Sequence, residues 1–290
     1  MLPNFIIVGA PKSGTTSLWH YLSQHPQIYM SLIKEPHYFS TNQRDLTLIE
    51  YEKLFRNRNN EIAVGEASTS YLWYKGTAER IKESIPNCKI IIILRNPADR
   101  LYSAYLQHKR IGAFFFDFKD IVNVLNQEQE NINKKAIDSI WNKGFYSSYV
   151  ENYYRVFGRK NVSIHLFNDL INSPQNLLES IFDFLNVDKT FTPNMRRQLN
   201  VGGDVGFAFL PKLFRLMGRV FKPLITKFIK YDTLNYHRHR ILGYKKIKHE
   251  DRMDDKLREE ISAIYFEDIK RLQIMIDRNL DFWVNPMKHE

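Results

Sequence analysis

The stretch FIIVGAPKSGTT, residues 5–16, joins a short apolar run to a glycine-containing turn. Its glycines, Gly9 and Gly14, have the spacing of the phosphate-binding loop GxxxxGK[ST] of nucleoside triphosphatases. In that loop a lysine follows the second glycine, whereas here Thr15 stands in that place and Lys12 lies inside the loop. The turn therefore predicts an anion site between a strand and a helix, and it leaves open which anion is bound.

Further strand and helix signals alternate along the chain. Short apolar runs predict strands that are buried on both faces, and the stretches between them predict helices. The predicted strands are 5–9, 63–66, 89–94 and 162–167, and the predicted helices are 15–24, 76–84, 97–110, 146–157, 174–185 and 251–277. This alternation predicts an α/β fold, a central parallel sheet flanked by helices. Ligands of such sheets bind at the carboxyl ends of the strands, where Gly9, Glu66 and Arg95 fall.

The whole chain, residues 1–290, is predicted to form a single domain. Residues 111–140, which are rich in Asn and Gln, and residues 205–250 are expected to be insertions or lid segments. The last predicted helix is expected to bury one apolar face, formed by Ile261, Ile264, Tyr265, Ile269 and Leu272.

The composition limits the partners and the compartment. A net charge of +10 and a pI near 9.4 favour an anionic partner, which could be a nucleotide, a nucleic acid, an acidic glycan or a membrane surface. A basic surface that only maintains solubility is the alternative. The single cysteine, Cys88, cannot form an internal disulfide, and no stretch reaches the ~18 uncharged, predominantly apolar residues that span a bilayer. We therefore expect a soluble, cytoplasmic protein.

The run KIIIILRNPADR, residues 89–100, places Arg95 at the end of a predicted strand. A phosphate loop that serves ATP typically has a magnesium-binding aspartate on a neighbouring strand. Here the nearest acid, Asp99, lies one turn into the next helix and is interpreted as a helix-start acid. Arg95 and Ser103, two helical turns later, predict a second anion site. Two anion sites without a metal site indicate a nucleotide with phosphates at two separate places rather than ATP.

Several motifs carry a family resemblance. PKSGTTSLW (11–19) and LRNPADRLYSAY (94–105) resemble the PAPS-dependent sulfotransferases. KEPHYFS (34–40) and VGEASTSYL (64–72) are similar to the heparan-sulfate-type branch and its bacterial relatives, and the same pattern continues in 144–170, 181–187 and 278–283. The resemblance implies a P-loop NTPase-like sulfotransferase fold. It also implies an enzyme that moves a sulfo group from 3′-phosphoadenosine 5′-phosphosulfate (PAPS) to a hydroxyl or amine, releasing adenosine 3′,5′-bisphosphate (PAP) without a metal ion.

The resemblance also assigns the donor site. It implies that Lys12 stabilises charge on the leaving oxygen, that Arg95 and Ser103 hold the 3′-phosphate, and that the 5′ end is held by Lys12, Ser13, Gly14, Thr15, Thr16 and Ser17. Arg197 falls where relatives close a loop over the adenine, although their usual Arg-Lys-Gly signature is missing here.

Glu35 matches the position of the catalytic base in the heparan-sulfate-type enzymes. A carboxylate there can take the proton of the acceptor as sulfur is attacked in line. If this segment is extended, His37 shares the face of Glu35 and is a candidate for substrate contact or catalysis. The alternatives are an exposed Glu35 paired with Lys34, and a His37 that only packs. Some relatives carry an acid five residues after the base, where this chain has Ser40.

The acceptor is expected to be a carbohydrate or glycolipid, with a small-molecule natural product as the alternative. Two other classes compete with a sulfotransferase. A nucleotide kinase would need a lysine after Gly14 and a magnesium-binding acid, which this chain lacks, and a basic nucleic-acid-binding protein would need a motif that reads RNA or DNA, and none is found.

The basic amphipathic segment 207–230 is compatible with a lid, a contact with a membrane surface or a contact with an acidic glycan. Glu66 is compatible with orienting Lys12 or the acceptor, and with capping the next turn. The oligomeric state is left open.

Overall fold

The computed structural model describes residues 1–40, 46–110, 114, 116–125, 132–195 and 253–284. The chain divides into two compact units. The first comprises Met1–Arg100, Asn142–Leu199 and Asp255–Glu290, and the second comprises Leu101–Trp141 and Asn200–Asp254. Arg197, segment 207–230 and the expected insertion 205–250 lie outside the described residues. The expectation of a single domain stays a prediction.

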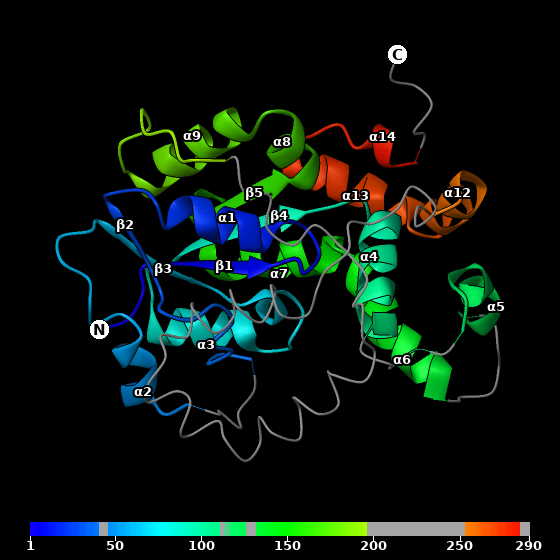
Figure 1. Cartoon of the computed structure of the whole chain (residues 1–290), viewed down its shortest axis with the longest axis horizontal. Helices are drawn as coiled ribbons and strands as arrows, with labels where there is room; N and C mark the ends of the chain where they lie inside the picture. Colours follow the sequence, from blue (N-terminus) through cyan, green and yellow to red (C-terminus); the bar gives the residue numbers. More distant parts are fainter. Residues whose placement is uncertain (41–45, 111–113, 115, 126–131, 196–252, 285–290) are drawn as a thin grey trace. The chain divides into compact units, whose positions relative to one another are not determined.

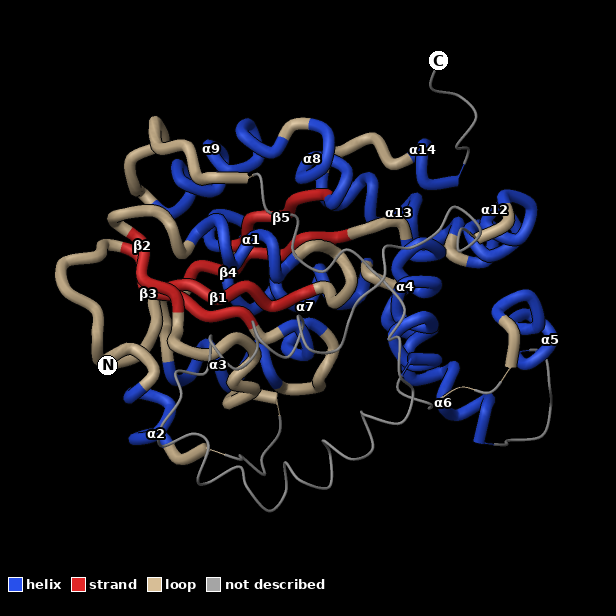
Figure 2. Tube along the Cα trace, in the orientation of Figure 1, coloured by secondary structure: helices blue, strands red, loops and turns tan. Residues whose placement is uncertain are grey.

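A five-stranded parallel sheet forms the centre of the first unit (Figures 1 and 2). Its strands are β1 (Phe5–Gly9), β2 (Ile28–Met30), β3 (Ala63–Ala67), β4 (Lys89–Leu94) and β5 (Val162–Leu166). They are arranged in the order β2-β3-β1-β4-β5. The predicted α/β fold with a central parallel sheet is confirmed. Because β1 lies between β3 and β4, the turns that follow these three strands meet at one edge.

Both faces of the sheet are covered because successive side chains of a strand point to opposite sides. Phe5, Ile7, Ile91 and Ile93 join one core with apolar residues of α1 (Thr15–Leu22), α8 (Phe167–Asn172) and α9 (Pro174–Leu185). Figure 1 shows these three helices on one side of the sheet, with α3 (Thr77–Ser84) and α7 (Ser147–Phe157) on the other. The described part of this unit also contains α2 (Leu48–Lys53), the start of α4 (Pro97–Arg110), α12 (Asp255–Ile264), α13 (Phe266–Ile276) and α14 (Asp281–Val284).

The prediction of one helix over residues 251–277 is wrong, because the structure has two helices there, α12 and α13. Tyr265 separates α12 from α13, and its N–H donates to the carbonyl of Ser262, three residues back, at 3.1 Å. The aromatic ring of Tyr265 packs against Phe145 with centroids 4.7 Å apart. Ile264, the last residue of α12, is 46% exposed, whereas the other four residues of the predicted face are buried. Strand β2 was not predicted, because three residues are too few to show a period.

The described part of the second unit contains the rest of α4, α5 (Ile121–Leu125) and α6 (Ile132–Trp141). Tyr105 lies among the rings of Phe114, Phe116 and Phe118, with centroids 5.0 to 5.8 Å away. Its hydroxyl donates to the carbonyl of Phe116 at 2.6 Å. The described residues between 114 and 140 thus include the helix α5 and most of α6, and the aromatic cluster packs around Tyr105.

Candidate functional site

The anion loop, residues 9–17, connects the end of β1 to the start of α1. Gly14 precedes the helix with φ +87°, a conformation that favours glycine. A Cβ on Gly14 would lie 2.6 Å from Leu170 Cδ2 and 2.9 Å from the ring of Phe167. Position 14 therefore requires glycine twice, for its backbone conformation and for the close approach of α8. Lys12 also has a left-handed backbone, with φ 67°, and such strain concentrates at functional sites.

The loop presents hydrogen-bond donors of the kind that bind an oxyanion. Ser13 is fully buried, and its hydroxyl finds no hydrogen-bond partner among the described residues. Thr15 is buried, while Thr16 and Ser17 are partly exposed. The first turn of α1 contains no acidic residue, so its N–H groups and partial positive charge are not neutralised locally. An anionic group fits these donors, because the buried Ser13 hydroxyl would otherwise lack a hydrogen-bond partner.

Arg95 reaches from the end of β4 to the anion loop. Its Nη1 donates to the carbonyl of Lys12 at 3.1 Å, and its guanidinium lies over the ring of Phe167, 4.7 Å from the centroid. Burial lowers the pKa of Arg95, and the charge of Asp99 partly opposes that shift. Arg95 forms no ion pair with any carboxylate in the described part of the chain. Its charge is therefore available to a second anion beside the loop.

Asp99 is paired elsewhere in the first unit. It lies in the first turn of α4, as interpreted from the sequence, and it accepts hydrogen bonds from Arg258 Nε at 2.8 Å and Nη2 at 3.1 Å. Ser103 lies further along α4 and belongs to the second unit. The expected pairing of Ser103 with Arg95 stays a prediction.

The second group of predicted residues lies in the Glu35 loop, residues 34–40, which follows β2. The carboxylate of Glu35 accepts hydrogen bonds from Lys34 Nζ at 2.7 Å and from Thr69 Oγ1 at 3.1 Å, and its Oε2 lies 3.3 Å from His37 Nε2. His37 Nδ1 lies 2.8 Å from Ser70 Oγ. The structure thus brings Glu35 and His37 together.

The backbone that joins these residues is not extended, contrary to the premise of the sequence argument. Glu35 and His37 have φ angles of 61° and 56° in the left-handed region. The two side chains meet because the loop turns sharply at both positions, and each turn costs roughly 1–3 kcal/mol that the surrounding structure must offset.

The environment of Glu35 keeps its carboxylate ionised. Burial acts to raise the pKa of Glu35, but the hydrogen bond to His37 and the positive charge of Lys34 outweigh it and lower this pKa to about 2. The pairing with Lys34 was the alternative interpretation of Glu35, and the structure shows that pair. The same carboxylate also contacts His37 and remains one-third exposed, so it can accept a proton from a molecule that reaches it.

Sequence reasoning missed the residues that hold the Glu35 loop. They come from the segment after β3 and from α3, and they are Ser68, Ser70, Tyr71, Thr77 and Arg80. The concentration of hydroxyl residues in VGEASTSYL was the available signal. That signal does not say which backbone groups the hydroxyls bind.

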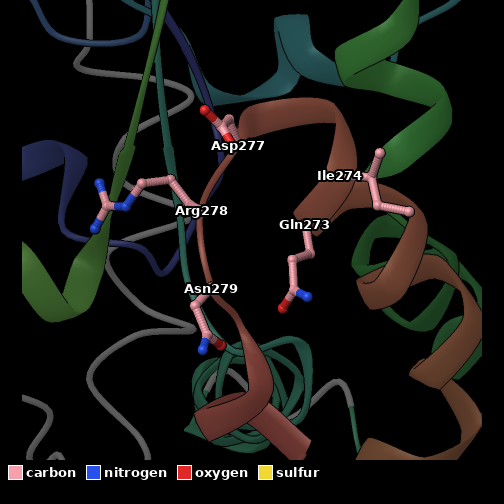
Figure 3. A pocket seen from close by; sticks show the side chains of 5 residues that line it. All are labelled: Gln273, Ile274, Asp277, Arg278 and Asn279. Carbon is pink, nitrogen blue, oxygen red and sulfur yellow. The ribbon is translucent and has the colours of Figure 1, made fainter.

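Two pockets in the first unit are lined by none of the predicted site residues. One has a volume of about 420 Å³ and lies at the end of α13, where Gln273, Ile274, Asp277, Arg278 and Asn279 surround it (Figure 3). The other, about 300 Å³, lies beside β5 and α9 and also includes Arg278. Arg278 is paired with Asp169 at 3.1 Å. These pockets are separate features from the anion loop and the Glu35 loop.

Among the described residues, no group of three His, Cys, Asp or Glu side chains could hold a metal ion. The helices described here include none with the length and apolar character needed to cross a membrane. The cytoplasmic location stays a prediction.

Comparisons with known proteins agree on one family. The sulfotransferase domain family matches residues 2–200 of the chain. Human carbohydrate sulfotransferase 15 is 27% identical over 246 residues, which cover 64% of this chain and 44% of that protein. The human bifunctional heparan sulfate N-deacetylase/N-sulfotransferase 2 is 29% identical over 223 residues, covering 71% of this chain and 24% of that protein. The chain thus spans less than half the length of these curated relatives.

A solved structure is similar over nearly the full length. It is a sulfotransferase from Alicyclobacillus acidocaldarius, with a TM-score of 0.71, 29% identity, and coverage of 98% of this chain and 99% of that one.

Proposed function

The chain belongs to the sulfotransferase domain family, and from that premise we propose that it transfers a sulfo group from PAPS to a hydroxyl or amine of a carbohydrate acceptor. The observation that supports the donor assignment is that the anion loop and Arg95 lie beside each other at one edge of the sheet. The anion loop offers the buried hydroxyl of Ser13, and Arg95 beside it has no carboxylate partner among the described residues. PAPS has anionic groups at its 5′ and 3′ ends that match two such sites.

In the proposed reaction the acceptor oxygen or nitrogen forms a bond to sulfur while the bond between sulfur and the bridging oxygen breaks. The acceptor proton passes to Glu35, and PAP leaves with the electron pair of the broken bond. Lys12 and the loop N–H groups stabilise the charge that grows on that leaving oxygen, which is a preorganised electrostatic effect. Two features favour Glu35 as the base: its carboxylate is oriented by contacts with His37 and Thr69, and it remains one-third exposed.

The carbohydrate acceptor is proposed from the relatives. Carbohydrate sulfotransferase 15 and the heparan sulfate enzyme are named for such substrates. The net charge of +10 suits an acidic glycan, since a basic surface concentrates an anionic chain.

The test begins with calorimetric titration of the purified chain with PAP and with AMP in excess EDTA. We expect tighter binding of PAP, because Arg95 adds a contact to the 3′-phosphate, and charge-assisted hydrogen bonds contribute roughly 1.5–3 kcal/mol. Arg95→Gln should reduce this preference. Equal affinity of the native chain for PAP and AMP would remove the 3′-phosphate site. Binding that requires magnesium would instead favour a kinase.

The acceptor is then sought by incubating the chain with PAPS and a panel of acidic and neutral oligosaccharides. We expect a gain of one sulfo group on at least one of them, read by mass spectrometry. Sulfation of small phenols or alcohols alone would replace the carbohydrate assignment.

A further inference from the structure

A buried carboxylate, Glu66, lies at the end of β3 beneath the Glu35 loop. It accepts hydrogen bonds from three hydroxyl groups: Ser68 Oγ at 2.7 Å, Tyr71 Oη at 2.8 Å and Tyr51 Oη at 2.9 Å. All four residues are fully buried. Because Glu66 is fully buried and its carboxylate binds these three hydroxyls, this side chain does not contact an acceptor directly.

Two of the three hydroxyls also receive a hydrogen bond from the Glu35 loop. The backbone N–H of His37 donates to Ser68 Oγ, and the backbone N–H of Phe39 donates to Tyr71 Oη, each at 3.1 Å. A backbone N–H can only donate, so each hydroxyl must turn its own hydrogen toward another acceptor. In both cases that acceptor is Glu66. The direction of both chains is therefore set, from loop N–H through hydroxyl to carboxylate.

From this geometry we propose that Glu66 is a positioning residue for Glu35. Glu66 acts through Ser68 and Tyr71, which hold the backbone of the Glu35 loop. The inference rests on the proposed role of Glu35 as base. The loop needs such support because Glu35 and His37 both have left-handed backbones. Without it, relaxation of either residue toward an extended conformation would swing the Glu35 carboxylate away from its present partners.

The ionised form of Glu66 is the one that suits all three donors. A proton on the carboxyl group, or the NH₂ of a glutamine, would face a hydroxyl whose hydrogen already points toward it. Burial raises the pKa of Glu66 to about 7, although the three hydroxyls act to lower it. The other titratable groups that face Glu66 are His37, Tyr51, Tyr71, Cys88 and Tyr153.

Tyr51 and Tyr71 form a matched pair for the test. Both are fully buried tyrosines that donate to the same oxygen of Glu66, at 2.9 Å and 2.8 Å. Only Tyr71 also accepts a backbone N–H of the Glu35 loop. Replacement by phenylalanine removes one buried hydroxyl in each case and keeps the ring. A purely structural role of Glu66 predicts the same result for both variants.

The experiment compares Tyr71→Phe, Tyr51→Phe, Ser68→Ala and Glu66→Gln with the native chain. Amide hydrogen exchange is followed at His37 and Phe39 by NMR. We expect faster exchange at Phe39 in Tyr71→Phe, at His37 in Ser68→Ala and in Glu66→Gln, whose NH₂ would replace the oxygen that Ser68 binds, and at neither in Tyr51→Phe. PAP affinity should stay within about 2-fold of native in all four.

Single-turnover sulfo transfer is then measured at saturating PAPS. A buried donor left without a partner costs about 1–2 kcal/mol, so Tyr71→Phe and Ser68→Ala should each slow transfer roughly 5- to 30-fold, while Tyr51→Phe stays near native. Equal rates and equal exchange in Tyr71→Phe and Tyr51→Phe would overturn the positioning role. If the native chain neither binds PAP nor transfers sulfo groups, the proposed function fails, and the amide exchange still decides whether Glu66 holds the loop.

Discussion

The anion loop and the Glu35 loop lie at the same edge of the sheet, yet they are held in different ways. The anion loop is shaped by its own backbone and by the close approach of α8 to Gly14. The Glu35 loop is shaped by side chains from elsewhere, since Ser68, Tyr71 and Arg80 bind its N–H and carbonyl groups. A loop of the first kind can be recognised from a short motif. A loop of the second kind depends on residues more than 30 positions away.

This difference divides the proposed chemistry into donor binding by the anion loop and proton transfer by the Glu35 loop, and mutations can test each part separately. If the division is correct, changes in the Glu35 loop alter the rate of transfer and leave donor affinity unchanged. Changes in the anion loop alter both.

The largest effect is expected for Glu35→Gln. The amide cannot accept the proton of the acceptor, so single-turnover transfer should fall roughly 10²- to 10⁴-fold, the usual contribution of a general base. Calorimetric titration should show native affinity for PAP, because Glu35 contacts Lys34, Thr69 and His37 rather than the anion loop. A near-native rate would make His37 the candidate base. Loss of PAP binding would place residues 34–40 in the donor site.

A somewhat smaller effect is expected for Lys12→Ala. Loss of one preorganised group that stabilises the leaving oxygen typically lowers turnover by about 10²- to 10³-fold. Affinity for PAP should also weaken, because the ammonium would contact the anion before the reaction. Lys53→Ala, at an exposed lysine near the end of α2, provides the charge-matched control. If both lysine variants reduce transfer equally, the loss reflects net charge, and Lys12 has no specific role.

The third prediction concerns stability and the protonation of Glu66 beneath the Glu35 loop. The pKa of Glu66 is about 7 in the folded chain against an ordinary value of 4.5, so the folded state retains a proton that the unfolded state releases in this range. The free energy of unfolding should therefore decrease as the pH rises from 4.5 to 7, by up to about 3 kcal/mol from this residue. Glu66→Gln has no such proton and should lack this component.

The measurement is urea unfolding of the native chain and of Glu66→Gln at several pH values between 4.5 and 8. As the pH rises, the unfolding free energy of the native chain should decrease relative to that of Glu66→Gln. Tyr51→Phe keeps the carboxyl group but loses a hydroxyl that lowers its pKa, so its stability should fall with rising pH at least as steeply as that of the native chain. Parallel curves for the native chain and Glu66→Gln would show that the pKa of Glu66 is not raised.

Most of the sheet could be predicted from local sequence, because four of its strands are short apolar runs bounded by turns. The anion loop could be predicted too, since the spacing of Gly9 and Gly14 is a local requirement of the backbone. The break at Tyr265 could not, because the residues on either side keep a helical period. At the break, the ring of Tyr265 packs on Phe145, which lies 120 positions earlier.

The sequence by itself determined the parallel α/β fold, the anion loop and the strand-end position of Arg95, because each depends on residue types at fixed short spacings. Only the tertiary structure decided how Glu35 is held. It brought His37 to 3.3 Å from Glu35 through a doubly left-handed turn, and it placed Glu66 under that turn through Ser68 and Tyr71. The physical reason is that a buried hydroxyl is directed by the donors and acceptors around it. Those groups come from segments that meet only when the sheet has formed.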